Sequence, residues 1–112
     1  MSSVWLGNKP NIYLNSFCFG YRITQKVNYH FFAFLLRSPS TRNQFNLLAQ
    51  GISRYNISKN KAMEIAVPLP SLEEQGKVGA FFTQLDNLIT LHQRKLEKLK
   101  NLKQAYLNEM FV

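Results

Sequence analysis

Residues 65–75 of this chain read IAVPLPSLEEQ, and the two prolines in this stretch divide the sequence into parts of different character. Before them, residues 63–67 alternate between apolar and other side chains, which is the pattern of a half-buried β-strand. Pro68 and Pro70 have no backbone N–H to donate to a neighbouring strand, so a central strand cannot continue through them. We therefore expect any strand here to end before Pro70.

A helix is predicted immediately after Pro70. Ser71 and Glu74 have the spacing of a capping box, in which the serine hydroxyl accepts from the Glu74 amide and the Glu74 carboxylate reaches back. No proline follows between Ser71 and Val112. The sequence thus predicts two domains, a mixed domain over residues 1–70 and one long helix over residues 71–112.

Apolar residues in the predicted helix recur every three or four positions, as in a coiled coil. Written as heptads, positions a and d form a pairing stripe made of Phe82, Leu85, Ile89, His92, Leu96, Leu99, Lys103, Tyr106 and Met110. We interpret His92 as a polar residue that sets the register of the pair. A helix over residues 71–112 is about 63 Å long, whereas a compact body formed by residues 1–70 is about 25–30 Å across. Part of the stripe is therefore expected to pack on a partner, and we predict a homodimer.

The part of the chain before Ser71 mixes two kinds of periodicity. Residues 12–23 alternate as a strand does, with Phe17, Phe19, Tyr21 and Ile23 on one face. Asn28 then has the features of a helix N-cap, and Ser38-Pro39 is expected to end that helix. A second short helix is predicted over residues 40–50. The predicted fold class is α+β, with a small sheet and short helices followed by the long helix.

Two glycines, Gly76 and Gly79, occur in the first turns of the predicted long helix. Each costs about 1 kcal/mol of helix stability relative to alanine. We expect them to permit the close approach of a neighbouring backbone.

The positive charge is concentrated in the first part of the chain. The 112 residues carry a formal net charge of +8. Residues 1–70 contain eight basic side chains and one acid, Glu64, whereas residues 71–112 contain six basic and five acidic side chains. An uncompensated positive field favours a polyanion, because cations that bind phosphates release condensed counterions. We prefer nucleic acid as the partner over the alternative that the charge only maintains solubility.

Several classes of protein are disfavoured by the composition. The longest apolar run, Phe31–Leu36, has six residues, far fewer than the ~20 that span a bilayer. The first twenty residues show no signal-peptide pattern. Cys18 is the single cysteine, which excludes an intrachain disulfide and a multi-cysteine zinc site. We expect a soluble cytoplasmic protein that does not contact a membrane.

The sequence lacks the constellations of an enzyme active site. It has no glycine-rich phosphate loop and no paired acidic motif, and neither histidine has metal ligands at suitable spacing. His30 is expected on a helix surface, His92 on the pairing stripe and Cys18 on a strand face, buried or half-buried. We predict no catalytic residue, no metal site and no enzymatic activity.

Residues 50–59 combine a glycine, hydroxyls, an amide, an aromatic ring and two cations. Such side chains can bond phosphates and base edges. The alternative, equally compatible with the composition, is a solvated turn in which Ser58 caps a short helix. The candidate DNA-binding residues are Arg22, Lys26, Ser53, Arg54, Tyr55, Asn56, Lys59 and Lys61.

Residues 65–75, together with the segment 51–58 before them and residues 85–89 after them, resemble the specificity (S) subunit of type I restriction-modification enzymes. The resemblance extends over residues 30–112. In that family two target-recognition domains each read one half of a split DNA sequence. Each is followed by a long helix, and the two helices pair antiparallel and dock methyltransferase subunits.

The resemblance implies roles for three segments. Residues 68–75 correspond to the junction between domain and helix, residues 85–110 to the spacer and docking helix, and residues 53–59 to a loop that approaches DNA. The implied partners are double-stranded DNA, a methyltransferase subunit, and a second copy or another specificity subunit. S-adenosylmethionine is expected only in the methyltransferase subunit, so the chain itself is expected to hold no cofactor.

The chain departs from the family pattern in size, because residues 1–70 are much shorter than one recognition domain. We interpret them as the trailing half of such a domain. An alternative function is therefore open, that of an oligomerisation or regulatory module that pairs with a full specificity or methyltransferase subunit and hardly touches DNA.

Overall fold

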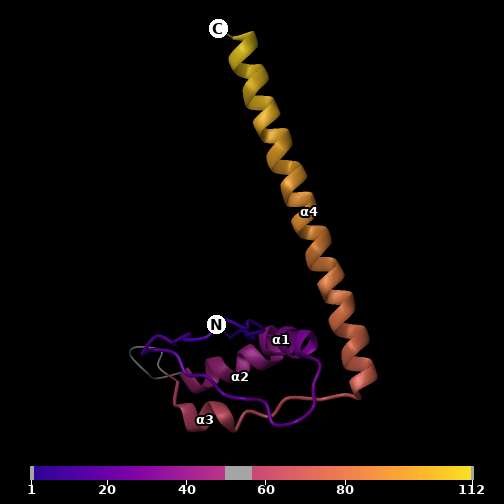
Figure 1. The fold of residues 1–112 in the computed structure, drawn as a ribbon. Helices are drawn as coiled ribbons and strands as arrows, with labels where there is room; N and C mark the ends of the chain where they lie inside the picture. Colours follow the sequence, from indigo (N-terminus) through magenta and orange to yellow (C-terminus); the bar gives the residue numbers. More distant parts are fainter. Residues whose placement is uncertain (1, 50–56, 112) are drawn as a thin grey trace. The chain divides into compact units, whose positions relative to one another are not determined.

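The computed structural model describes residues 2–49 and 57–111. In these residues it forms four α-helices, shown in Figure 1: α1 (Tyr29–Arg37), α2 (Pro39–Ala49), α3 (Lys59–Met63) and α4 (Leu72–Met110). The chain divides into two compact units, Met1–Gly79 and Ala80–Val112. The boundary between these units comes after Gly79, so the first two turns of α4 belong to the first unit. The domain boundary predicted at Pro70 rests instead on a change in sequence composition.

Helix α1 begins and ends where its sequence predicts. The Asn28 side chain accepts a hydrogen bond from the Phe31 amide at 3.0 Å, which satisfies one of the free N–H groups of the first turn. Ser38 ends the helix in an extended conformation, and its amide donates to the Leu35 carbonyl at 3.1 Å. The buried side chains of the helix are Phe31, Phe32 and Leu36.

Helix α2 begins at Pro39, one residue before the predicted start. A proline suits the first helical position, because its missing N–H would have no partner there. The Ser38 hydroxyl donates to Thr41 Oγ1 at 3.1 Å and accepts from the Thr41 amide at 3.4 Å. Thr41 is 1% exposed. Pro39 thus ends α1 and begins α2, and Ser38 is the residue that links the two helices.

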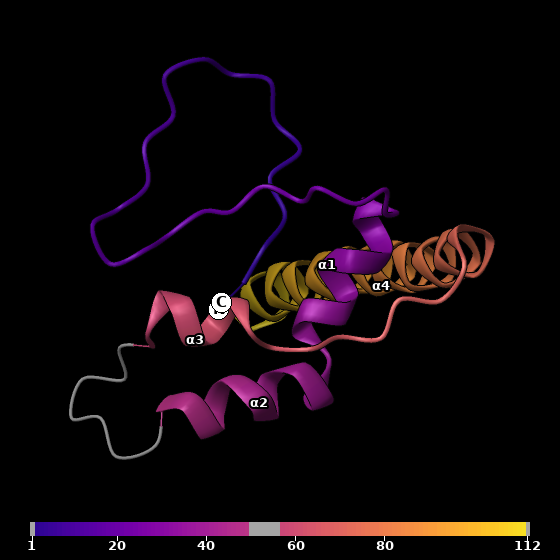
Figure 2. The ribbon, with the colours of Figure 1, turned by 90° about the horizontal axis from the view of Figure 1, so that it is seen from below.

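Helix α2 packs against α1 and against α3, and Figure 2 shows α2 and α3 next to each other. The Gln44 amide donates to the Ala66 carbonyl at 3.2 Å and so holds the segment after α3 close to α2. The N-cap of α3 is Ser58, whose side chain makes no capping hydrogen bond. The short helix predicted by the solvated-turn alternative is therefore present, without its hydroxyl cap.

The predicted α+β fold is wrong, because the described residues form helices and contain no strand. Residues 12–23 are irregular, and all but the half-buried Ile23 are exposed, with Phe17 85% and Tyr21 46% accessible. The alternation is interrupted by a turn at Asn15, whose side chain accepts from the Phe17 amide and whose carbonyl accepts from the Cys18 amide, each at 2.9 Å. Alternation supplies two faces, but a strand also needs a neighbour to accept its hydrogen bonds.

The second predicted strand, residues 63–67, is also wrong. Met63 is the last residue of α3, and the amides of Glu64 and Ile65 donate back to Lys61 and Ala62 at 3.2 and 3.4 Å. These bonds close a helical turn over the start of the run. Cys18, expected to be buried or half-buried on the first strand, is exposed.

Helix α4 confirms the predicted long helix. Its 39 residues correspond to a length of about 58 Å. The Glu74 amide donates to the Ser71 hydroxyl at 3.3 Å, which is the N-capping half of the predicted capping box. Glu73 and Glu74 lie in the first turn, where the helix dipole favours negative charge. Among the described residues, no helix is apolar enough over sufficient length to cross a membrane.

Candidate nucleic-acid interface and pairing helix

The cations that precede α4 in the first unit are free to meet an external anion. The described ones, Lys9, Arg22, Lys26, Arg37, Arg42, Lys59 and Lys61, are all exposed. Over residues 2–49 and 57–111 the structure gives one ion pair, Lys77–Glu73 at 3.1 Å in α4. The positive field inferred from the sequence is therefore not cancelled by internal pairing.

The predicted DNA-binding residues come from separate segments. Arg22 and Lys26 lie on the irregular segment before α1, and Lys59 and Lys61 lie in α3. Residues two apart in a helix point to different faces, so a flat surface meets only one of the two lysines squarely. The remaining four, Ser53, Arg54, Tyr55 and Asn56, lie outside the described residues.

Tyr21 adjoins Arg22, and partial burial raises the pKa of its phenol. Desolvation disfavours the phenolate, so the hydroxyl remains protonated at neutral and moderately alkaline pH. From the sequence, this ring is expected on one face of a strand, together with Phe17, Phe19 and Ile23. In the structure it is 46% exposed and can offer a ring face and an O–H donor beside a cation.

Gln75 joins the start of α4 to the start of α1. Its side chain is 3% exposed and makes two hydrogen bonds. Its Nε2 donates to the Pro70 carbonyl at 2.8 Å, and its Oε1 accepts from the Asn28 amide at 2.9 Å. We call this arrangement of Asn28, Pro70, Gln75 and Gly79 the junction clamp.

Sequence reasoning identified Gln75 only as the last residue of a motif. The available sequence signal was the position of this glutamine, one turn into a helix that follows two prolines. This position does not identify the two hydrogen-bond partners, which lie 5 and 47 residues away. The more distant of these partners, Asn28, is brought to Gln75 only in the folded chain.

Gly79 allows the backbones of α4 and α1 to approach closely. A Cβ atom at this position would lie 2.9 Å from Asn28 Oδ1 and 2.9 Å from the Phe31 backbone nitrogen, closer than side chains tolerate. At Gly76 the nearest atom to such a Cβ is Asn28 Nδ2 at 4.0 Å, an ordinary contact. The expected reason is confirmed for Gly79, and it is wrong for Gly76.

The pairing stripe is exposed along its whole length. His92 and Lys103 are exposed, as are the apolar members, from Leu85 at 39% to Met110 at 73%. Large apolar side chains left in water along one helix face indicate a surface that another chain can cover. The structure thus leaves every predicted pairing residue accessible.

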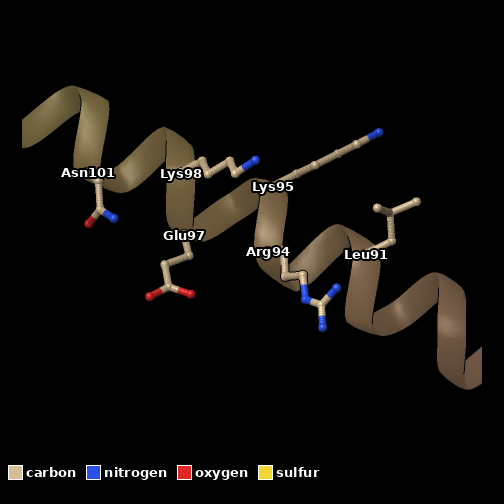
Figure 3. A pocket seen from close by; sticks show the side chains of 6 residues that line it. All are labelled: Leu91, Arg94, Lys95, Glu97, Lys98 and Asn101. Carbon is tan, nitrogen blue, oxygen red and sulfur yellow. The ribbon is translucent and has the colours of Figure 1, made fainter.

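A shallow depression on α4 is lined by Leu91, Arg94, Lys95, Glu97, Lys98 and Asn101. Figure 3 shows Leu91, Lys95 and Lys98 on one side of the helix and Arg94, Glu97 and Asn101 on the other. One helix cannot enclose a ligand, because enclosure requires walls from several elements. Among the described residues there is also no group of three or more His, Cys, Asp or Glu side chains placed to hold a metal ion.

The family comparison covers most of the chain. Residues 2–101 match the family model described as the type I restriction modification DNA specificity domain. The chain belongs to this family. The match confirms the resemblance identified from the proline-containing motif, and it extends that resemblance toward the N-terminus, as far as residue 2.

Two curated specificity subunits of type I restriction enzymes from Methanocaldococcus jannaschii are similar to this specificity-domain chain. The MjaX specificity subunit is 26% identical over 87 residues, which is 77% of this chain and 20% of the relative. The MjaVIII specificity subunit is 27% identical over 85 residues, which is 76% of this chain and 20% of the relative. The aligned part of the chain thus spans about a fifth of these relatives' length. No solved structure matches the chain.

Gly79→Ala should destabilise the protein, and Gly76→Ala should not. The methyl group at Gly79 would collide with the Phe31 backbone, and such overpacking costs about 1–3 kcal/mol. At Gly76 the same change gains up to about 1 kcal/mol of helix propensity. Urea unfolding followed by circular dichroism measures both free energies, and equal values for the two variants would contradict the close-approach role.

Gln75→Leu should destabilise the first unit by about 1–3 kcal/mol, because it removes the partners of the Asn28 amide and the Pro70 carbonyl. Gln84→Leu, an exposed position in the same helix, is the matched control and should change stability by less than about 0.5 kcal/mol. Hydrogen exchange at the Asn28 amide gives a local measure. Unchanged protection in Gln75→Leu would show that the clamp does not hold this amide.

Proposed function

We propose that this chain is a non-catalytic, DNA-binding part of the specificity subunit of a type I restriction-modification system. The observation that carries the proposal is the set of exposed cations that precede α4 in the first unit, none of them in an ion pair within the described residues, in a chain of the DNA specificity family. The first unit binds double-stranded DNA, and α4 binds protein partners.

DNA binding by the first unit is mainly electrostatic in this proposal. Arg22, Lys26, Arg54 and one lysine of α3, Lys59, contact phosphates, which recur on every sequence. Tyr55 and Asn56 supply stacking or base-edge contacts. Because the chain corresponds to about a fifth of each curated relative, its selectivity for sequence is weak.

Helix α4 provides the protein contacts. Its exposed pairing stripe supports a homodimer, or pairing with another specificity subunit, and docking of a methyltransferase subunit. S-adenosylmethionine and the catalytic residues belong to that methyltransferase subunit, and the complex acts in the cytoplasm. The chain itself positions the complex on DNA and catalyses no reaction.

A second function is supported by one observation. In the described part of the first unit, four apolar side chains are buried, Phe31, Phe32, Leu36 and Ala62, whereas the pairing stripe of α4 is exposed throughout. A chain with a small core and a long accessible helix also suits an oligomerisation or regulatory module with little DNA affinity of its own.

Salt titration of duplex DNA binding separates the two functions. If Arg22, Lys26, Arg54 and Lys59 each neutralise one phosphate, log K should fall against log[salt] with a slope of about −3 to −4. Lys59→Ala should weaken binding to all sequences alike and reduce the slope by about one. Lys77→Ala, whose lysine is already paired with Glu73, is the control and should leave the slope unchanged. Absence of binding at about 50 mM salt would favour the module.

The purified chain should transfer no methyl group to DNA. Incubation with labelled S-adenosylmethionine and duplex DNA should leave the DNA unlabelled, because in this proposal the methyl donor binds to the methyltransferase subunit and not to this chain. Labelled DNA in the absence of any methyltransferase subunit would overturn the non-catalytic assignment.

A further inference from the structure

The charges of the long helix are segregated along its length. Residues 94–103 contain five basic side chains and one acid, whereas residues 71–93 and 104–112 together contain one basic and four acidic side chains. The near balance of charge over residues 71–112 therefore conceals a short basic band, which lies within the second unit, Ala80–Val112. A surface that is charged only for solubility carries both signs interspersed. The segregation instead indicates a binding surface for an anion.

Three cations of this band lie on one face of α4. Each residue turns an α-helix by about 100°, so Arg94, Lys95 and Lys98 fall within about 100° of its circumference. The same three residues line the shallow depression described above, with Leu91 at one end and Asn101 at the other. Figure 3 shows their side chains projecting from successive turns of the helix. We call Arg94, Lys95, Lys98 and Asn101 the basic face.

The basic face is separate from the centre of the pairing stripe. In the heptad pattern Arg94 occupies an f position and Lys98 a c position, both of which point outward, and Lys95 occupies a flanking g position. All three side chains are exposed. The long lysine stem lets the Lys95 ammonium group extend away from the stripe. A chain that covers the pairing stripe therefore leaves these cations accessible to a second partner.

The cations of the basic face are not neutralised by ion pairs of their own helix. Over residues 2–49 and 57–111 the ion pair that the structure gives is Lys77–Glu73, outside the band. Glu97 also lines the depression, so that three cations there accompany one acid. This excess of positive charge is exposed to solvent and can attract an external anion.

The composition of the face fits a DNA backbone better than a protein surface. The centre of a protein–protein interface is depleted of charge and especially of lysine, whereas protein–DNA interfaces are strongly positive. Here the cations occupy the centre, and the one apolar residue, Leu91, lies at the end. Arg94 and Lys98 are separated by an axial rise of about 6 Å, which is close to the rise of about 7 Å over two nucleotide steps of one DNA strand.

We propose that the basic face of α4 binds phosphates of double-stranded DNA. Arg94 and Lys98 neutralise neighbouring phosphates of one strand, Lys95 neutralises a third, and the Asn101 amide donates to a phosphate oxygen. Phosphates recur on every sequence, so this contact adds affinity without selectivity. Helix α4 thus contacts DNA with one face and protein with another. The inference rests on the DNA-binding function proposed above and adds a second DNA-contacting surface to it.

Salt titration of duplex DNA binding by the full chain tests the basic face. The triple variant Arg94→Gln, Lys95→Gln, Lys98→Gln keeps good helix formers in α4. It should bind at least about tenfold more weakly at about 50 mM salt, and its slope of log K against log[salt] should be shallower by about 2 to 3. The parent slope should be steeper by the same amount than the four cations of the first unit alone produce.

Single variants supply a matched comparison on the same helix. Lys98→Gln should make the slope shallower by about one, because one phosphate contact is lost. Lys100→Gln removes the same charge two residues away, about 200° around the helix, and should leave the slope unchanged. Circular dichroism should show equal helix content for both variants.

Chemical modification gives a readout that needs no variant. Lysines of the parent chain are acetylated with and without duplex DNA, and the modified positions are identified by mass spectrometry. Bound DNA should protect Lys95 and Lys98 from acetylation and leave the modification of Lys100 unchanged. Protection of Lys95 and Lys98 would support direct contact with DNA.

Three outcomes would overturn the proposal. A triple variant that binds DNA with the parent's slope, or unchanged acetylation of Lys95 and Lys98, would reject the basic face as a DNA contact. Equal effects of Lys98→Gln and Lys100→Gln would reject a face-specific role. In each case DNA binding by the first unit, which Lys59→Ala reports, would stand. A parent chain that does not bind duplex DNA at about 50 mM salt would reject both this inference and the DNA-binding function.

Discussion

The two hydrogen bonds of the Gln75 side chain are the constraint on which the first unit depends. One bond holds the chain leaving Pro70, and the other holds the amide of Asn28, which in turn caps α1 with its own side chain. A buried amide has both a donor and an acceptor to satisfy, and this site satisfies both. The start of α4 and the start of α1 are therefore held by the same residue.

The close approach that these bonds require explains the glycine at position 79. The α1 backbone occupies the space that a side chain at position 79 would need. A glycine at this position lowers the helix propensity of α4, but it lets the two helices approach each other. Beyond Gly79 the helix changes role. Its side chains from Ala80 onward are almost all exposed, so this part is stabilised by local hydrogen bonds and by whatever chain covers its apolar face.

Local features were predictable because their causes lie within a few residues. The Asn28 cap, the helix end at Ser38 and the Ser71 cap each involve a side chain and an amide three residues apart, or a proline next to the affected residue. The predicted strands were wrong because alternation of apolar and polar residues shows only that a segment could have one apolar face. A β-strand also needs a second segment beside it that completes its backbone hydrogen bonds. Nearby turn bonds at Asn15 and after Met63 took precedence over both patterns.

By itself the sequence determined the positions of α1, α2 and α4, the excess positive charge of the chain before Ser71, the pairing stripe of α4 and the family motif that ends at Gln75. These depend on the order of side chains along the chain, through capping, charge and the helical period. Only the tertiary structure decided that Gln75 is buried, that Gly79 is needed where Gly76 is not, and that residues 12–23 form no strand. Each of these depends on a neighbour in space, and spatial neighbours 47 residues apart leave no local signal in the sequence.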